Sequence, residues 1–500
     1  MPSSIPPVSR RHVLAAVAAL SATAMMPLHR ARATAPAVLS VTTRTLEVHG
    51  RAATVYGITR PDGGHGLAAT AGDAFSVRLT NGLAEPTLIH WHGLTPPWRQ
   101  DGVPGVSQAP LPPGTGFDYG FPLARPGTNW MHSHLGLQEQ GLLAAPLIVA
   151  DPADAGRDEQ EVVLMLHDFT FRDPGEIMAD LRGGQTHGMA GMDHSGHTMG
   201  AMPGMDRSTP ATTNAMPGMN HDMSGMGDGM AMDLNDVEYD AYLANDRTLV
   251  DPEVVRVDRG GRVRLRIING SAATNFHIDL GAIDGTLIAV DGMPIEPVTG
   301  RRFPIAIAQR LDIRMTVPAG TALPVLALRE GDRQRTGLVL ATPGAAIARI
   351  ADLGEGKAAP LDLSLEARLR ASSPLAARPV DRTIPMVLGG DMASYAWTLN
   401  GKAHGQGAPL SVRQGERVAI AMTNPSMMAH PMHLHGHHFQ VVAIDGTPLS
   451  GALRDTVLVP PGKTVTVAFD ADNPGRWAFH CHHLYHMEGG MMTTLEYEGL

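Results

Sequence analysis

The stretch His480-Cys481-His482, followed by His486 and Met491, contains the only cysteine of the 500-residue chain. Side chains alternate between the two faces of a β-strand, so His480 and His482 are predicted to point one way and Cys481 the other. One short strand would then offer two imidazoles to one metal site and a thiolate to a second. The main chain around Cys481 would join the two sites, as an electron-transfer connection between two copper centres requires.

Composition limits the class of protein. Glycine (56) and proline (39) are plentiful, which is typical of an all-β chain with many turns, and the length of 500 residues predicts two to four domains. The formal net charge of −10 and the lack of a basic motif disfavour nucleic-acid binding. Histidine (24) and methionine (28) are abundant, and their imidazole and thioether groups suit copper. A single cysteine excludes an intramolecular disulfide; taken alone, it would be interpreted as a small buried apolar residue.

Residues 1–33 are predicted to be an export signal. The segment SRRHVL at 9–14 is similar to a twin-arginine motif, an apolar run extends to about Leu28, and the small residues of 31–33 offer a cleavage site. A membrane anchor is the alternative, but the run is too short and too rich in alanine for a stable span, and no other segment is apolar enough to cross a bilayer. The expected destination is the periplasm.

One sequence pattern occurs three times. In each copy an alternating strand pattern ends in Asn, a His follows, and an Asp-Gly pair comes 20, 22 or 21 residues after the Asn. The three copies are Asn81, His90 and Asp101; Asn269, His277 and Asp291; and Asn424, His433 and Asp445. Three copies predict three related β-sandwich domains at residues 36–152, 153–345 and 378–500, with a linker at 346–377.

The second repeat is lengthened by a low-complexity segment at residues 187–232, in which Met is mixed with Gly, Pro, Asp and His. Glycine and proline exclude a regular helix, so the segment is predicted to be an inserted flexible loop. Thioether sulfur prefers Cu(I), and Met-x-x-Met and Met-x-His spacings recur, which predicts that the loop captures extra copper. The alternative is a disordered linker whose methionines are incidental.

Four His-x-His pairs supply most of the candidate ligands: His90 and His92, His132 and His134, His433 and His435, and His480 and His482. Each pair places both imidazoles on one face of a strand, and eight imidazoles could hold three copper ions with positions left open for a substrate. His430 and His486 remain to form a His₂Cys set with Cys481, and Met491 is available as a weak axial sulfur, which is the composition of a blue-copper site. Coincidental pairs on solvated strand faces are the alternative; it is disfavoured because all four pairs lie at equivalent positions of the first and third repeats.

These motifs, in this order, resemble those of multicopper oxidases with three cupredoxin domains, and in particular the periplasmic copper-resistance oxidases. The stretches at 131–140, 268–272 and 483–488 are similar to that group as well. The resemblance implies an all-β fold of three cupredoxin-like Greek-key β-sandwiches. It also implies four copper ions, with a trinuclear cluster between the first and third domains and a copper-free middle domain that acts as a spacer.

The resemblance further implies a role for each ligand. The type 1 copper is expected at His430, Cys481 and His486, with Met491 axial; the type 2 copper at His90 and His433; one type 3 copper at His92, His132 and His482; and the other at His134, His435 and His480. A reductant would give single electrons to the type 1 copper, and these would pass through Cys481 to His480 and His482. Four electrons at the cluster would reduce O₂ to two waters.

Two carboxylates are candidates for proton supply. Asp101 matches a family carboxylate near the cluster, but it is also the turn residue of the repeated Asp-Gly pair, and this second interpretation has equal weight. Glu488 is the weaker candidate, because Met487 stands where many relatives carry an acid directly after the last type 1 histidine.

Three functions remain open from the sequence. The first is a cuprous oxidase that supports copper tolerance, as the ligand set, the export signal and the Met-rich segment suggest. The second is a laccase-like oxidase of phenols or other small organic reductants, and the third is a non-enzymatic periplasmic copper store. Five methionines near the type 1 ligands are predicted to form a Cu(I) docking patch, with core packing as the alternative: Met427, Met428, Met432, Met487 and Met492.

Overall fold

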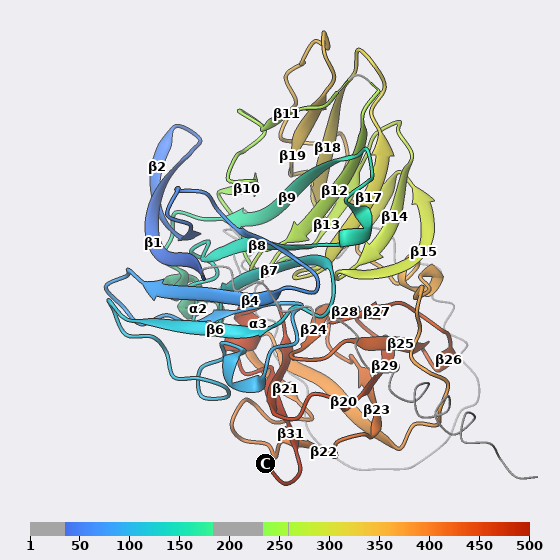
Figure 1. Ribbon diagram of the computed structural model, residues 1–500. Helices are drawn as coiled ribbons and strands as arrows, with labels where there is room; N and C mark the ends of the chain where they lie inside the picture. The colour runs from blue at the N-terminus through green and yellow to red at the C-terminus, as the bar shows by residue number, and fades with distance from the viewer. Residues whose placement is uncertain (1–35, 184–233, 259) are drawn as a thin grey trace, which may run out of the picture.

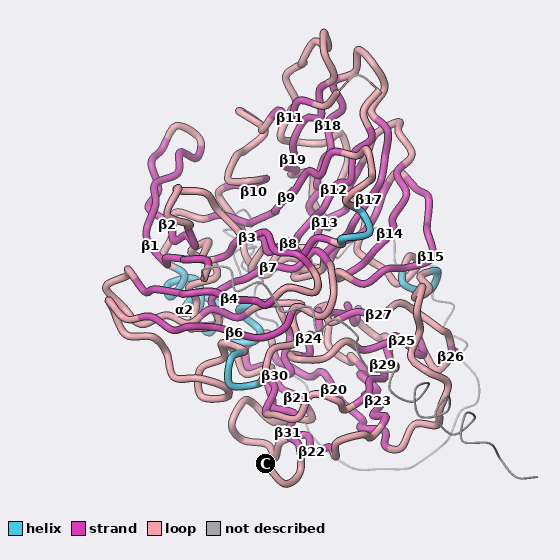
Figure 2. The backbone as a smooth tube through the Cα atoms, in the orientation of Figure 1, coloured by secondary structure: helices cyan, strands magenta, loops and turns pink. Residues whose placement is uncertain are grey.

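The computed structural model describes residues 36–183, 234–258 and 260–500 (Figure 1). The predicted export signal and the Met-rich segment at 187–232 lie outside the described residues. Strands and loops make up nearly all of the described chain (Figure 2), and the strands form three two-sheet sandwiches, which confirms the all-β prediction. None of the helices within the described ranges is long and apolar enough to cross a bilayer.

The first sandwich, coloured blue to cyan in Figure 1, consists of the sheets β2-β1-β4-β6 and β3-β8-β7-β5. Its strands are β1 (Ala37–Val48), β2 (Arg51–Thr59), β3 (Leu67–Thr70), β4 (Ala74–Asn81), β5 (Ile89–His90), β6 (Gly116–Pro122), β7 (Gly127–Ser133) and β8 (Ala144–Ala150). In β4, Phe75, Val77 and Leu79 are buried, while the residues between them face outward. This alternation explains why the segment is a half-buried strand. Short 3-10 helices lie at Trp98–Gln100 and Pro152–Asp154.

The second sandwich consists of the sheets β10-β9-β12-β17-β14-β15 and β11-β19-β18-β13-β16. Its strands are β9 (Gln160–Phe169), β10 (Ala241–Ala244), β11 (Val254–Arg256), β12 (Arg262–Asn269), β13 (Phe276–Asp279), β14 (Gly285–Val290), β15 (Met293–Gly300), β16 (Arg302–Ile305), β17 (Arg310–Thr316), β18 (Ala322–Arg329) and β19 (Arg335–Ala341). Helix α2 (Pro174–Arg182) follows β9, and the Asp173 side chain caps it by accepting from the Gly175 amide.

The third sandwich, orange to red in Figure 1, ends the chain. Its strands are β20 (Arg382–Asp391), β21 (Ala396–Leu399), β22 (Leu410–Val412), β23 (Arg417–Thr423), β24 (His430–Leu434), β25 (Phe439–Ile444), β26 (Thr447–Pro448), β27 (Leu453–Arg454), β28 (Thr456–Val459), β29 (Thr464–Asp470), β30 (Arg476–Cys481) and β31 (Met492–Tyr497). One sheet is ordered β21-β20-β23-β29-β25-β26, with β27 paired to β25, and the other β22-β31-β30-β24-β28. Helix α3 (Leu484–Glu488) lies between β30 and β31.

The sequence repeat is also a repeat of strand pairing. In the first sandwich β5 pairs with β7, so that His90 lies opposite His132. In the third, β24 pairs with β30 in the same arrangement, and His433 lies opposite His480. The corresponding strands of the second sandwich are β13 and β18, where His277 faces Leu328. The pairing therefore brings two histidine-bearing strands together in two sandwiches, whereas the middle one has a single histidine there.

The repeated Asn has one structural role in all three sandwiches. Its side-chain amide donates to two backbone carbonyls, and its Oδ1 accepts from the amide two residues later. The carbonyls belong to Glu85 and Leu111, to Thr274 and Ile305, and to Met428 and Val459. These buried bonds hold the loop that leads into β5, β13 or β24.

The segment at 346–377, predicted to be a linker, is packed against the second and third sandwiches. Leu361, Leu365 and Leu369 are buried, and a 3-10 helix spans Glu366–Arg368. The buried Glu366 carboxylate accepts a hydrogen bond of 2.6 Å from Arg454 in β27. The segment thus joins the second and third sandwiches by packing and by an ion pair.

We expect Asn269→Ala to lower the free energy of unfolding by about 2–3 kcal/mol, because the substitution leaves buried backbone groups without partners. Thr316→Ala, at an exposed position of the same sandwich, is the control and should change stability by less than about 0.5 kcal/mol. Urea unfolding followed by circular dichroism measures both. Equal urea concentrations at the unfolding midpoint of the two variants would contradict the role given to Asn269.

Candidate metal centres

Two groups of buried metal-ligating side chains stand out: one lies within the third sandwich, and the other lies at the junction of the first and third sandwiches. We call His430, Cys481 and His486 the cysteine site. We call the other group the histidine cluster: His90, His92, His132, His134, His433, His435, His480 and His482. Every one of these side chains is at most 7% exposed. Groups drawn from both sets bring three potential ligand atoms within 4.8 Å of one another.

The cysteine site is assembled from the end of one strand, the start of another, and a helix. Cys481 is the last residue of β30, His430 is the first of β24, and His486 lies in α3. The Cys481 Sγ atom lies 3.7 Å from the Nδ1 atom of each histidine, and the two Nδ1 atoms are 3.2 Å apart. One sulfur and two imidazole nitrogens therefore converge on one point.

Outer hydrogen bonds set the direction of both imidazoles. The Nε2 atom of His430 lies 2.8 Å from the Ser426 hydroxyl, and that of His486 lies 3.0 Å from the Asp236 carboxylate. Because Nε2 of each ring is held by this hydrogen bond, the Nδ1 atom on the other side of the ring points towards Cys481. Burial lowers the pKa of both histidines and raises the pKa of the Cys481 thiol. The thiol therefore becomes a thiolate only where a cation compensates the charge.

Met491 is fully buried next to this site. Its amide donates to the carbonyl of His486, and its carbonyl accepts from the amide of Cys481, each at 3.0 Å. These two bonds hold the residue beside two members of the site, where the sequence predicts an axial sulfur.

The histidine cluster forms where β5 and β7 of the first sandwich meet β24 and β30 of the third. The Nε2 atom of His480 lies 2.9 Å from that of His435 and 3.3 Å from that of His134. The Nε2 atoms of His482 and His132 are 3.4 Å apart. Although β30 ends at Cys481, His480 and His482 both lie in this cluster, on the side of the chain away from the Cys481 sulfur.

The protonation pattern of these rings fits a site that binds a cation. The Nδ1 atoms of several histidines face acceptors that cannot donate: the carbonyl of Asp101 for His90, that of Asp455 for His433, and that of Cys481 for His480. Each Nδ1 must therefore carry the hydrogen, which leaves Nε2 as a bare lone pair. Lone pairs that face one another in a buried space repel each other unless a cation lies between them.

Unpartnered nitrogen atoms show which atoms are free to bind the cation. Within the described ranges, His90 Nε2, His433 Nε2 and His92 Nδ1 are buried and have no hydrogen-bond partner. His92 is reversed relative to the other two, because its Nε2 atom lies 3.1 Å from the Asp455 carboxylate. The donor set of imidazoles, one thiol and free lone pairs fits copper ions.

Asp101 contacts the outer nitrogens of two rings of the cluster. Its side chain is fully buried, with Oδ2 2.8 Å from His435 Nδ1 and Oδ1 3.2 Å from His90 Nδ1. The corresponding Asp291 and Asp445 have a φ of 48° as the first residues of hairpin turns, whereas Asp101 has a φ of −77° after a 3-10 helix. Its contacts with two candidate ligands therefore distinguish Asp101 from the turn residues of the other repeats.

Glu488 lies at the end of α3, away from these contacts. Burial raises the pKa of its carboxyl group. Within the part of the chain that the structure describes, its carboxylate makes no hydrogen bond to a candidate ligand; only its backbone carbonyl is engaged, by Arg182 at 3.1 Å.

Three further carboxylates, none of them predicted from the sequence to be functional, touch candidate ligands. Glu139 Oε2 lies 2.7 Å from His132 Nδ1 and Oε1 3.9 Å from His482 Nδ1. The sequence carried a signal for Glu139, because it lies five residues after His134 in the stretch at 131–140 that resembles the copper-resistance oxidases. Asp236 and Asp455 carried no such signal, because they reach His486 and His92 only through the fold.

Comparison with known proteins places these centres in context. Family models described as multicopper oxidase match residues 40–154, 160–322 and 377–499. The multicopper oxidase MmcO of Mycobacterium tuberculosis is 35% identical over 88% of this chain and 82% of its own length. Copper resistance protein A of Escherichia coli is 28% identical over 85% and 86%. The crystal structure of a multi-copper oxidase from Pseudomonas thermotolerans superposes with a TM-score of 0.66 at 25% identity, over 92% of this chain and 98% of that one.

We expect Glu139→Gln to weaken copper retention by the histidine cluster roughly tenfold, because a carboxylate that orients a ligand ring contributes about that much to affinity. Glu330→Gln is the matched control, since the Glu330 carboxylate is also buried but accepts from Asn275 and Leu361 in the middle of the chain. Chelator competition at neutral pH measures the effect. Copper loss of equal size in both variants would mean that Glu139 has only a general structural role.

Proposed function

Because the chain belongs to the multicopper oxidase family, we propose that it oxidises Cu(I) beside the cysteine site and reduces O₂ to water at the histidine cluster. Family membership makes the chain an oxidoreductase with copper centres of types 1, 2 and 3. One observation carries the proposal. The Cys481 side chain lies in one site, while its neighbours His480 and His482 lie in the other.

We propose the following ligand sets. The cysteine site with Met491 would hold the type 1 copper, and His90 and His433 the type 2 copper. His92, His132 and His482 would hold one type 3 copper, and His134, His435 and His480 the other. Bound there, copper supplies one-electron transfer at the cysteine site and the centre for four-electron reduction of O₂ at the cluster. The covalent main chain from Cys481 to His480 and His482 gives electrons a bonded route between the two sites.

Reduction of O₂ to two waters also consumes four protons. Asp101 is our first candidate to hold and pass protons, since its carboxylate contacts both His435 and His90 in a space closed to bulk water. Glu488 is the second candidate: burial raises its pKa, which favours a protonated carboxyl group beside α3. The same reaction converts four Cu(I) ions to Cu(II), so charge and electrons balance.

Methionines around the cysteine site support Cu(I) as the electron donor. Met427, three residues before His430, is 65% exposed, and its thioether is available to a soft cation from solution. Met428, Met432 and Met492 are buried, so core packing accounts for them. Met487 is partly buried. Of the five methionines predicted to form a docking patch, Met427 and Met487 are accessible.

The described residues on either side of the Met-rich segment lie at the cysteine site. Before it, Arg182 donates to the carbonyl of Glu488 at the end of α3. After it, Asp236 accepts from Tyr395 at 2.5 Å and contacts His486 at 3.0 Å. Both flanks thus contact the helix that carries His486, and this supports our proposal that residues 187–232 collect extra copper and deliver Cu(I) to this site.

We also propose a role in copper tolerance, in the periplasm. The twin-arginine-like segment at 9–14 supports export, and the name of copper resistance protein A supports the physiological role. The three family matches support division of the chain into domains at 36–152, 153–345 and 378–500, with an export signal at 1–33.

We expect Cys481→Ser to abolish O₂ consumption with either Cu(I) or a phenol, because it removes the sulfur ligand at which electrons enter. Copper bound to the eight histidines should be retained, so the type 2 EPR signal should persist. An oxygen electrode measures the rates in parallel with the wild type. O₂ uptake at the wild-type rate in this variant would refute the proposed route, and wild-type protein that consumes no O₂ with any donor would indicate a copper store.

Deletion of residues 187–232 should raise KM for Cu(I) by about tenfold or more and leave phenol oxidation unchanged, since thioethers recruit Cu(I) and not phenols. A deletion variant with unchanged Cu(I) kinetics would remove the segment from the reaction. Faster turnover of phenols than of Cu(I) by the wild type would instead favour a laccase-like function.

A further inference from the structure

Arg310 of the middle sandwich extends to the edge of the histidine cluster. It begins β17, and its side chain is fully buried. Its guanidinium forms a two-pronged ion pair with Asp455 of the third sandwich, with a distance of 2.7 Å between Nη1 and Oδ1. Its Nε atom donates at 3.1 Å to the carbonyl of Thr128 in the first sandwich. All three sandwiches therefore meet at one arginine.

Asp455 in turn orients two candidate copper ligands from different sandwiches. Its carboxylate accepts from His92 Nε2 at 3.1 Å, and its backbone carbonyl accepts from His433 Nδ1 at 2.8 Å. The neighbouring Thr456 hydroxyl lies within 3.3 Å of both rings and also bonds the carboxylate. The position of Asp455 thus decides which nitrogen each ring presents to the cluster.

A carboxylate bonded to one histidine alone can rotate about its side-chain torsion angles. Two parallel bonds from a planar guanidinium fix the plane of the carboxylate, which a single donor does not do. The fixed carboxylate accepts the His92 Nε2 hydrogen, so the ring turns its unpartnered Nδ1 atom inward. The reversed orientation of His92 therefore depends on the Arg310–Asp455 pair.

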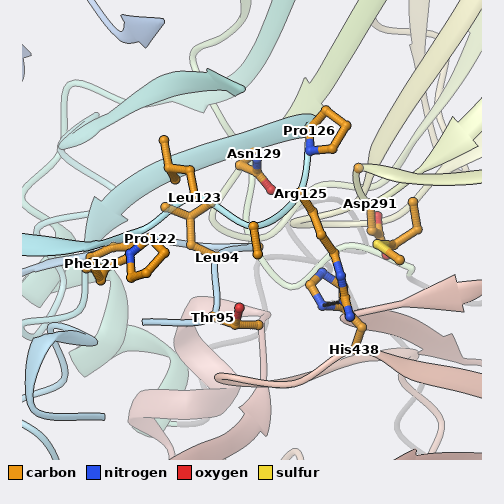
Figure 3. A pocket seen from close by; sticks show the side chains of 14 residues that line it. Leu94, Thr95, Phe121, Pro122, Leu123, Arg125, Pro126, Asn129, Asp291 and His438 are labelled. Carbon is orange, nitrogen blue, oxygen red and sulfur yellow. Dashed lines mark hydrogen bonds between the residues drawn. The ribbon is translucent and has the colours of Figure 1, made fainter. Parts of the chain in front are cut away.

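The surroundings exclude water from this pair. Gly93 has a φ of 93°, and a Cβ atom there would lie 2.7 Å from Arg310 Nη2 and 2.3 Å from Asn129 Oδ1. Figure 3 shows the pocket that Gly93 and Asn129 help to line, with Arg125 pointing towards the His438 ring. The pocket has room for about one water molecule, at ≈ 20 Å³. Arg310 and Asp455 are themselves fully buried, in surroundings of low dielectric constant where opposite charges attract most strongly.

We propose that Arg310 is a positioning residue for the histidine cluster: by fixing the Asp455 carboxylate, the middle domain sets the orientation of His92 and so the copper affinity of the cluster. This inference rests on the proposed function and assigns the middle domain a part in assembling the cluster. The cysteine site has no contact with this pair among the described residues, so its properties should not depend on Arg310.

The test replaces Arg310 with Gln in the full-length, copper-loaded protein. We expect copper bound to the histidine cluster to dissociate about 10-fold to 100-fold more readily in chelator competition, as is typical when a partner of a ligand histidine is lost. The type 2 EPR signal should change, whereas the blue absorption of the cysteine site should not. For the protein that retains copper, kcat should fall while KM for Cu(I) stays constant.

Arg266→Gln is the matched control. Arg266 is equally buried and donates to the Thr128 hydroxyl, but it pairs with Asp312 and Glu161, neither of which contacts a candidate ligand within the described residues. Chelator resistance and EPR spectra that match between Arg310→Gln and Arg266→Gln would overturn the proposal.

If Arg310→Gln does not fold, Arg310→Lys provides the test, since lysine keeps the charge without the two-pronged geometry. Copper retention and EPR spectra of Arg310→Lys that equal those of the wild type would also overturn the proposal. Wild-type protein that binds no copper would instead count against the proposed function.

Discussion

The alternation of side chains at His480-Cys481-His482 is the constraint on which the two centres depend. Cys481 lies 3.7 Å from two imidazoles of one site, while its neighbours on either side contribute to the other. Because consecutive side chains point in opposite directions, the separation of the two sites is fixed by a single peptide segment. Neither site can move without moving the other, and this is the basis of the proposed electron route.

Burial prepares both sites to bind metal. Ten histidines and one thiol of the two sites are excluded from water. Burial lowers the pKa of the His433 and His435 imidazoles and raises the pKa of the Cys481 thiol. Backbone carbonyls and carboxylates hold the hydrogens on the outer nitrogens, so lone pairs face inward. Cations bound there would offset the repulsion between these lone pairs, and the Asp101 and Asp455 carboxylates lie next to the ligand rings, where they would balance part of the cation charge.

The sequence allowed the all-β fold to be predicted because strand patterns repeat around Asn81, Asn269 and Asn424. The strand order is equivalent in the second and third sandwiches, and the two sheets of the first sandwich keep the same order with fewer strands. The candidate ligands could be proposed because side chains alternate between the two faces of a strand, and this alternation can be seen within three neighbouring residues of the sequence. Asp236 and Arg310 could not be found in this way. They reach His486 and Asp455 across domain interfaces, and no local pattern encodes which surfaces dock. The family resemblance implies that the middle domain is a spacer, although its Asp236 contacts His486 and its Arg310 pairs with Asp455, which bonds His92.

The most direct measurement of the central claim is the number of O₂ molecules consumed, and of H₂O₂ molecules released, when fully reduced protein is mixed with O₂. If Cys481 connects the two sites, its blue absorption should return in step with the uptake of one O₂ per four electrons, without release of H₂O₂. Release of H₂O₂ at one per two electrons, or return of the blue absorption at a rate independent of the cluster, would show that the two sites do not act as one unit.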